Sequence, residues 1–245
     1  MGAATGIRWT DSTFNPWWGC THVSPGCVNC YAETVASRRG LAWGVQADRR
    51  FYPDKHWNEP RVWDRRAAKD GVPRRVFCAS MADVFEDRRD LDAQRARLWS
   101  LIEETPNLRW QLLSKRPENV LAMIPPRWLS GMPSNVWLGT SVEDRLRLGR
   151  VDVLRTIPVH VRFLSVEPLL EDLDVLDLAG IGWVIVGGES GPGARPMRAE
   201  WARSVRDQCI AGGVPFFFKQ WGGRAASAGG HVLDGRTWDE FPSGG

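Results

Sequence analysis

Short runs of nearly continuous apolar residues recur along this chain, separated by stretches of mixed polarity. The clearest runs lie at 75–80, 109–115, 136–141, 161–167, 183–189 and 215–221. Apolar runs of this length without polar alternation are typical of β-strands that are covered on both faces. The segment 7–20 is expected to supply one more strand near the start of the chain.

Several of these runs are separated by stretches with helical periodicity. Residues 90–105, 141–156 and 199–213 each place apolar side chains largely along one side of a helix, and a pair of glycines ends the last of them. Strand, helix and strand at spacings of about 20 to 35 residues indicate βαβ units and a parallel sheet. We therefore predict an α/β fold, a partial or complete parallel (β/α) barrel, with a doubly wound open sheet as the alternative.

The barrel is expected to occupy residues 1–222. The remaining residues, 223–245, are rich in glycine and serine, which is typical of an irregular flap or a fraying tail. A single unit of this size is reasonable because α/β barrels often reach such lengths undivided.

Polar residues follow almost every predicted strand. In a parallel barrel the carboxyl ends of the strands meet on one face, where barrel active sites are built. A lone Ser or Asp after a strand is more simply a helix cap, but a repeated pattern that includes lysines and glutamates exceeds what capping requires. The residues that predict a shared polar site are Ser80, Asp83, Glu86, Lys115, Arg116, Ser141, Glu143, Ser165, Glu167, Glu189, Lys219 and Gln220.

Charge and hydropathy narrow the class of protein. The formal net charge of +3 is too small to imply a polyanionic partner by itself. No apolar run approaches the roughly 18 residues that a membrane span needs, and the first residues lack the apolar stretch of a secretion signal. We expect a soluble, cytoplasmic protein with no membrane partner.

Three of the five cysteines are crowded into one loop, as Cys20, Cys27 and Cys30. In a reducing compartment, a clustered and odd-numbered set indicates a metal site rather than disulfides. Two interpretations remain open. With His22, the three thiolates form a structural Cys3His zinc site, although His22 lies awkwardly close to Cys20; without it, they hold a [4Fe–4S] cluster that leaves one iron free for another ligand.

The motifs resemble those of known families. The cysteine loop on a βα barrel is similar to that of the radical S-adenosylmethionine (SAM) superfamily. More closely, the chain resembles a family named after phage gene products thirty-seven and sixty-eight, itself related to radical SAM enzymes. The matching stretches are "NPWWGCTHVSPGCVNCYAE", "VFCASMADVFED", "LLSKRP", "VWLGTSVED", "RFLSVEPLL", "VIVGGESGPGARPM" and "GVPFFFKQWG".

This chain departs from the superfamily pattern in three respects. The first two cysteines are separated by six residues instead of three, and Asn29 stands where an aromatic residue usually precedes the last cysteine. The "GGE" that usually follows the second strand appears late, at 187–189, and the early position carries Ser80 and Asp83 instead.

The resemblance implies two cofactors, a [4Fe–4S] cluster and SAM, and reductive cleavage of SAM followed by hydrogen abstraction from a substrate. Cys20, Cys27 and Cys30 would hold the cluster. The residues implied for SAM are Ser80, Asp83, Ser141, Glu143, Gly187, Gly188 and Glu189. Those implied to face the substrate or the SAM carboxylate are Lys115, Glu167, Lys219 and Gln220.

An electron donor for the cluster is one implied partner, and a nucleotide or nucleic acid is the expected substrate. The segment 49–75 has nine Lys/Arg against four Asp/Glu, and Trp17, Trp18 and Trp221 flank the expected site. Arginines interleaved with aromatic faces can bind and stack on nucleic acid, although tryptophans in the core and a solvated basic face explain the same pattern. The alternative function is a non-enzymatic nucleic-acid-binding protein with structural zinc.

Overall fold

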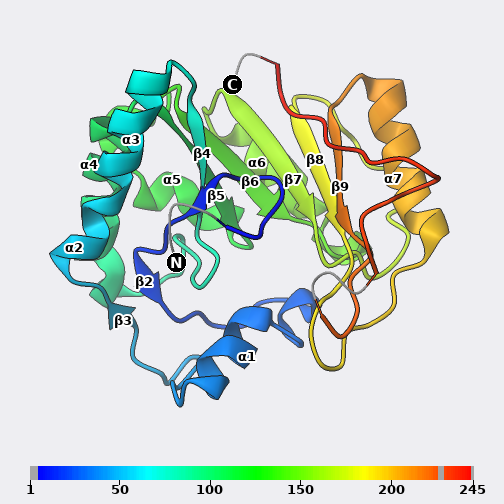
Figure 1. Cartoon of the computed structure of the whole chain (residues 1–245), viewed down its shortest axis with the longest axis horizontal. Coiled ribbons are helices and arrows are strands. Elements are labelled where there is room, and N and C mark those ends of the chain that lie inside the picture. The colour runs from blue at the N-terminus through cyan, green and yellow to red at the C-terminus, as the bar shows by residue number, and fades with distance from the viewer. Residues whose placement is uncertain (1–4, 226–228, 244–245) are drawn as a thin grey trace.

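The computed structural model describes residues 5–225 and 229–243. Its centre is a curled parallel sheet of seven strands (Figure 1). The strands, in their spatial order, are β1 (Ser12–Thr13), β4 (Arg74–Cys78), β5 (Leu108–Ser114), β6 (Val136–Ser141), β7 (Val161–Val166), β8 (Trp183–Gly187) and β9 (Phe216–Gln220). Every neighbouring pair is parallel.

The strand order shows that the barrel is partial. Spatial order follows chain order throughout, whereas a doubly wound sheet reverses direction partway. Within the described residues, β1 and β9 are the two edges of the sheet and do not pair with each other. The prediction of a parallel (β/α) barrel is therefore confirmed in its partial form.

Helices cover the outer face of the sheet. They are α2 (Asp54–Trp57), α3 (Glu59–Asp70), α4 (Asp92–Glu104), α5 (Val120–Met123), α6 (Gly149–Thr156) and α7 (Ala199–Gly212). The first part of the predicted helix at 141–156 is a loop with a 3₁₀ turn, Arg145–Arg147, because β6 continues to Ser141. None of the helices in the described part of the chain is long and apolar enough to cross a membrane.

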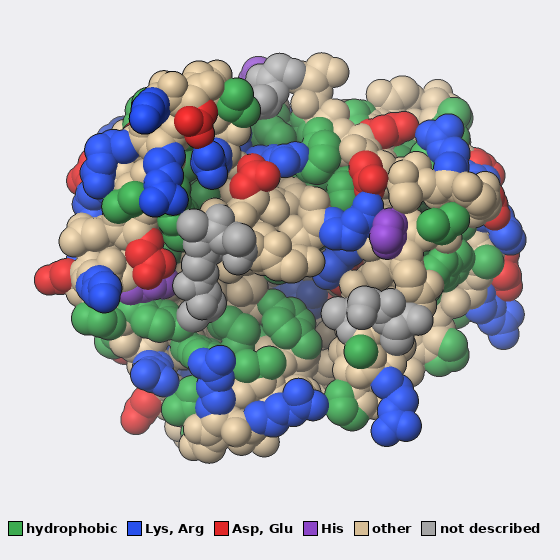
Figure 2. All heavy atoms as spheres, in the orientation of Figure 1, with side chains coloured by type: hydrophobic (Ala, Val, Ile, Leu, Met, Phe, Trp, Pro, Cys, Tyr) green, Lys and Arg blue, Asp and Glu red, His purple; other side chains and the backbone are tan. Residues whose placement is uncertain are grey.

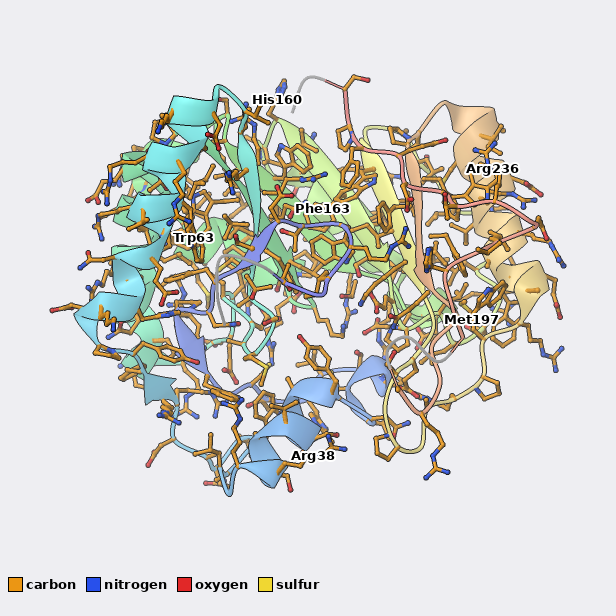
Figure 3. All side chains as sticks on the ribbon, viewed as in Figure 1. Arg38, Trp63, His160, Phe163, Met197 and Arg236 are labelled. Atoms are coloured by element: carbon orange, nitrogen blue, oxygen red, sulfur yellow. The ribbon has the colours of Figure 1, made fainter. Side chains whose placement is uncertain are left out.

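Alternate side chains of the strands divide the core into two layers. Val76, Leu112 and Leu138 pack toward the helices. On the inner face an aromatic cluster fills the amino-terminal half of the half-barrel, formed by Trp9, Phe77, Trp137, Phe163, Trp183 and Phe217. Figure 3 shows Phe163 pointing into this interior. This aromatic floor leaves the carboxyl ends of the strands as the part of the interior that carries polar groups.

A small antiparallel pair supports the start of the chain. β2 (Trp17–Trp18) pairs with β3 (Arg50–Phe51). The exposed fractions of Trp17 and Trp18 are only 0% and 5%, and Trp18 packs with Ala32 and Met81 in a satellite core. Of the two interpretations of these tryptophans, the structure supports the one that places them in the core, because their rings stabilise this segment from inside.

The C-terminal segment packs on the edge of the sheet. Leu233 and Trp238 belong to the main core, and Phe218 N–H donates to the Trp238 carbonyl at 2.8 Å. Trp183 Nε1 donates to the carbonyl of Glu240 at 2.8 Å. Residues 229–243 thus cover β9 rather than fray, while 226–228 and 244–245 of the expected tail lie outside the described residues.

Candidate functional site

The loop 20–30, called the cysteine loop below, crosses the carboxyl ends of the strands. It contains the short 3₁₀ turn Pro25–Cys27 and leads into α1 (Tyr31–Arg38). Figure 1 shows α1 lying below the strand ends, apart from the helices of the outer face. Cys20, Cys27 and Cys30 are free thiols, each half-buried. The structure therefore places the three cysteines at the face where the polar residues were predicted to converge.

One buried ion pair holds the first cysteine. The Arg116 guanidinium lies 2.8 Å from the Asp83 carboxylate. The same guanidinium donates to the Thr21 carbonyl at 2.7 Å and to Cys20 Sγ at 3.8 Å. Asp83 itself accepts hydrogen bonds from Ser114 Oγ, from Arg116 and from two backbone N–H groups. Asp83 thus organises the ends of β4 and β5 and aims Arg116 at the cysteine loop.

A second buried ion pair, between Arg49 and Glu86, also holds Thr21 of the cysteine loop. Arg49 binds Glu86 through two nitrogens at 2.7 and 2.9 Å, and both side chains are almost fully buried. The Arg49 guanidinium also donates to the Thr21 hydroxyl at 2.9 Å. Thr21 is therefore held by one arginine on its side chain and by another on its carbonyl.

Glu143 anchors the middle of the cysteine loop. Its carboxylate accepts a hydrogen bond from Ser24 Oγ at 2.6 Å and is paired with Arg150 at 2.8 Å and Lys115 at 3.3 Å. A Cβ atom on Gly26 would lie 2.6 Å from the Glu143 side chain, so only glycine permits this close approach. Burial acts to raise the pKa of Glu143, but the two cations outweigh it and the pKa is lowered.

Glu189 anchors the last part of the loop. It accepts from Asn29 Nδ2 at 2.9 Å and binds Arg195 through both carboxylate oxygens. Arg195 in turn donates to the Pro25 carbonyl at 2.9 Å. Burial acts to raise the pKa of Glu189, but the hydrogen bonds from Arg195 and Asn29 lower it overall. The residue that departs from the radical SAM pattern, Asn29, is thus used to fasten the loop.

These two carboxylates make the order of the loop sensitive to acid. A carboxyl group with a lowered folded-state pKa stabilises the fold above its unfolded pKa, and that stabilisation is lost as the pH falls through the folded pKa. For Glu143 and Glu189 the ordinary value is 4.5, and both are shifted down. We expect protection of the loop amides from hydrogen exchange, corrected for intrinsic rates, to be constant above about pH 5 and to fall below about pH 4.

Amides of β5 and β6 serve as an internal control for this measurement. A Glu189→Gln variant should show a smaller dependence of loop protection on pH, since one of the two titrating groups is gone. Loop protection that rises on acidification would contradict the assignment.

Above the aromatic floor, the inner face carries small side chains between two lysines. Ser141, Ser165 and Gly187 occupy neighbouring strands, β6 to β8. Lys115 Nζ donates to Ser141 Oγ at 3.0 Å on one side. On the other side, Lys219 forms a close ion pair with Glu167. Of the residues predicted to face a ligand, these have the fewest structural commitments.

The other predicted ligand residues are engaged in packing. Gly188 lies against the backbone of the next strand, since a Cβ there would be 1.9 Å from the Trp221 carbonyl oxygen. Gln220 Nε2 donates to Ser190 Oγ at 2.5 Å. Ser80 accepts from Asn15 Nδ2 at 3.1 Å, and its carbonyl accepts from the Tyr31 hydroxyl at 2.5 Å, which ties β4 to α1. Their assignment to SAM or substrate stays a prediction.

Sequence reasoning placed Arg116 in the shared polar site but did not predict that arginines fasten the cysteine loop. Arg116 stands beside Lys115 in "SKRP", and the buried carboxylates after other strands were the signal that a buried cation was needed nearby. Arg49, Arg150 and Arg195 come from distant loops and a helix, and no local pattern distinguishes them from exposed arginines.

The cysteine donors fit an iron–sulfur cluster better than a single zinc ion. His22 Nε2 is engaged with Glu33 at 2.7 Å, and both side chains are exposed. Four zinc ligands at about 2.0–2.3 Å from one ion must lie within a few ångströms of one another. Among residues 5–225 and 229–243, no three His, Cys, Asp or Glu side chains gather closely enough to hold one ion. With His22 engaged elsewhere, the loop offers three thiols, and cysteine thiolates are the usual ligands of iron–sulfur clusters.

Any metal centre bound by Cys20 would have to displace the proton of its thiol. Burial, together with the nearby Asp83 carboxylate, raises the pKa of the Cys20 thiol to about 12. At neutral pH the free thiol is therefore protonated, and a metal centre competes with that proton for the sulfur.

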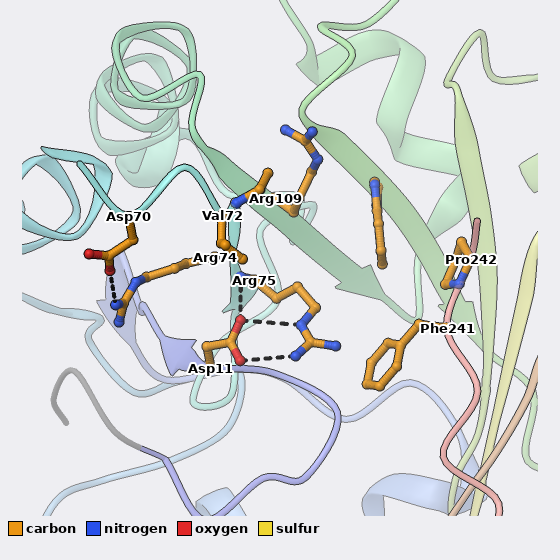
Figure 4. A pocket seen from close by; sticks show the side chains of 10 residues that line it. Asp11, Asp70, Val72, Arg74, Arg75, Arg109, Phe241 and Pro242 are labelled. Atoms are coloured by element: carbon orange, nitrogen blue, oxygen red, sulfur yellow. Dashed lines mark hydrogen bonds and ion pairs between the residues drawn. The ribbon is translucent and has the colours of Figure 1, made fainter. Parts of the chain in front are cut away.

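A second hollow lies at the opposite, amino-terminal end of the strands. Figure 4 shows this pocket, lined by Arg74, Arg75 and Phe241 among others. Arg74 is paired with Asp70 at 2.7 Å and Arg75 with Asp11 at 3.0 Å. The three cysteines and the polar residues that follow the strands lie at the other end of the sheet, so we assign the functional site to the cysteine face.

The curled parallel half-barrel, with three free cysteines in the loop after its first strand, is a partial (β/α) barrel. The chain belongs to the family described as "Protein of unknown function (DUF5131)", whose sequence profile matches residues 4–242. The match to phage gene products thirty-seven and sixty-eight stays a prediction. No curated protein matches the chain in sequence.

Two solved structures share the fold. A single-substitution variant of spore photoproduct lyase superimposes with a TM-score of 0.53 and 14% identity, over 85% of this chain and 63% of that one. A double variant of the same lyase, with bound AdoMet and dinucleoside spore photoproduct, gives a TM-score of 0.50 and 14% identity, over 84% and 65%. The chain thus spans just under two thirds of the length of these relatives, and the likeness is one of fold.

Proposed function

We propose that this protein is a radical SAM-type enzyme. Cys20, Cys27 and Cys30 would hold a [4Fe–4S] cluster, and SAM would bind beside it at the carboxyl ends of the strands. The observation that carries this proposal is the position of three free thiols, on a loop fastened to three strand ends, over the open end of a half-barrel. The double variant of spore photoproduct lyase, which has the same fold and is 14% identical in sequence, contains bound AdoMet.

The cofactors, when bound, supply reductive cleavage of SAM and hydrogen abstraction. The side chains of the protein bind and orient the cofactors and the substrate. Lys115 and Lys219 offer cations to the carboxylate of SAM or of a substrate, and Glu167 offers an acceptor for an ammonium group. Ser141 and Ser165, which are paired on neighbouring strands, occupy little of the inner face because their side chains are small.

The aromatic floor contributes by closing the site from below. Trp137, Phe163, Trp183 and Phe217 are all 2% exposed or less. A reactive carbon-centred species is protected from side reactions when water is excluded around it. The aromatic floor therefore separates the polar part of the interior from the amino-terminal end of the strands.

We propose a nucleotide or nucleic acid as the substrate, as the basic segment 49–75 predicts. Figure 2 shows Lys and Arg side chains over α3 and along the edge formed by α1. Arg49, Arg61, Arg74 and Arg75 of the segment are committed to ion pairs. The exposed residues Arg50, Lys55, Arg65, Arg66 and Lys69, with Arg38 at the end of α1 and Arg39 directly after it, remain to bind phosphates. The lyase of the same fold holds a dinucleoside.

Metal content after anaerobic reconstitution tests the proposal. We expect a brown protein with about four irons per chain. Cys27→Ala should lose most of the iron, whereas His22→Ala should retain it, since His22 is engaged with Glu33 on the surface. A colourless protein with one zinc, lost equally in both variants, would establish the structural-zinc alternative.

The substrate class is tested by following 5′-deoxyadenosine formation. Reduced protein and SAM would be mixed in turn with single-stranded DNA, duplex DNA, RNA and mononucleotides. Formation stimulated by one of these over the protein-only reaction is the expected result. Equal background formation with all of them would exclude nucleic acids and nucleotides as substrates.

A further inference from the structure

We infer that Arg116 is a positioning residue for the cluster: it orients Cys20 and makes the cluster easier to reduce. This inference rests on the proposed function, because it concerns the metal centre that the cysteines would hold. It goes further in assigning a redox role to a residue outside the expected ligand set.

The contacts of Arg116 fix its guanidinium from three sides. Nη1 lies between the Asp83 carboxylate, at 2.8 Å, and Cys20 Sγ, at 3.8 Å. Nη2 donates to the Thr21 carbonyl at 2.7 Å. Only 8% of the side chain is exposed. A planar guanidinium held by three acceptors has one orientation, and that orientation directs an N–H group at the sulfur.

Asp83 is itself immobilised, so the direction is built into the sheet. Ser114 Oγ donates to it at 2.7 Å, and the backbone N–H groups of Phe85 and Lys115 donate at 3.0 and 3.1 Å. These donors come from the end of β5 and from the loop after β4. The position of the Arg116–Asp83 pair is therefore fixed by the barrel and not by the cysteine loop.

A cationic donor beside a ligand sulfur favours the reduced cluster. Reduction adds negative charge, and hydrogen bonds and net charge around the sulfurs are the main means by which a protein sets the potential of such a cluster. Since the pair is buried, this effect is weakly screened by solvent. Removing the donor should lower the midpoint potential.

The chain offers a matched control in Arg49. It is also a buried arginine, paired with Glu86 through two hydrogen bonds, and it holds the same loop residue through the Thr21 hydroxyl at 2.9 Å. Its other hydrogen bonds go to the carbonyls of Gly44 and Ala47. Arg49 thus supports the loop without contacting a cysteine sulfur.

The test compares Arg116→Gln, Arg116→Lys and Arg49→Lys with the unaltered protein after reconstitution. Iron content is measured first, and the midpoint potential is then followed by the EPR signal of the reduced cluster. We expect an unchanged midpoint potential for Arg49→Lys and a lower one for Arg116→Gln. Arg116→Lys should give an intermediate potential, because lysine keeps the positive charge but lacks the planar guanidinium with its several N–H donors.

Equal shifts in the Arg49 and Arg116 variants would overturn the inference, since both would then act by loosening the loop. An unshifted potential in Arg116→Lys with full iron content would overturn it as well. If Arg116→Gln takes up no iron, the comparison of the two lysine variants still decides the question. Failure of the unaltered protein to bind iron would instead refute the proposed function.

Discussion

Replacing Asp83 with alanine is expected to lower the free energy of unfolding by about 3–5 kcal/mol, the usual cost of leaving a buried charge without its partner. The variant leaves the Arg116 guanidinium without its carboxylate partner, and only 8% of the Arg116 side chain is exposed. It also leaves Ser114 Oγ and two backbone N–H groups without their acceptor. Urea denaturation of the metal-free protein measures the loss. Hydrogen exchange should show that the segment around Cys20 opens at the same time.

An exposed ion pair serves as the control for Asp83. Asp152 is paired with Arg155 at 2.6 Å, but 77% of its side chain is exposed. Asp152→Ala should therefore cost less than about 1 kcal/mol, as is usual for surface pairs. If Asp83→Ala costs as little as Asp152→Ala, the pair with Arg116 does not organise the site.

A methyl group on Gly188 is expected to cost at least about 3 kcal/mol, at or beyond the upper end of the range for overpacking. A Cβ atom at this position would lie 1.9 Å from the carbonyl oxygen of Trp221 and 2.6 Å from its carbonyl carbon. Both are backbone atoms, and Gly188 N–H is bonded to the Gln220 carbonyl at 2.9 Å, so neither strand can move aside alone. Gly188→Ala should unfold at a clearly lower urea concentration.

The preceding residue is the matched control. A Cβ on Gly187 would meet the Glu167 side chain at 3.2 Å, and a side chain can shift by the few tenths of an ångström required. Gly187→Ala should cost about 1 kcal/mol or less. Equal losses in the two variants would show that the close approach of β8 and β9 at Gly188 is not the determining contact.

The structure shows an anchoring role for several of the predicted site residues, and their assignment to SAM stays a prediction. The strand ends predict that Asp83, Glu143 and Glu189 lie at one polar face, and the resemblance to radical SAM enzymes implies that they bind SAM. They do lie at that face, but each is buried, neutralised by arginine or lysine, and bonded directly or through an arginine to the cysteine loop. A carboxylate that faces a ligand and one that anchors a loop have the same position in the sequence, and only the partner distinguishes them.

The fold could be predicted because its signal is local. Apolar runs such as 183–189 and helical segments such as 199–213 are read from neighbouring residues, and parallel connection follows from their alternation. Whether the barrel is partial or complete could not be predicted from neighbouring residues. It depends on whether β1 and β9 meet, and the C-terminal segment around Trp238, packed on β9, occupies that edge.

The sequence by itself determined the class of fold, the face on which the site is built and the three thiols that it carries, since strand ends and cysteine spacing are properties of short segments. Only the tertiary structure decided how that site is held. Arg49, Arg116 and Arg195 come to the cysteine loop from separate places in the chain, and a buried carboxylate selects each of them by charge and distance. Such pairings are made in space, where residues far apart in sequence become neighbours.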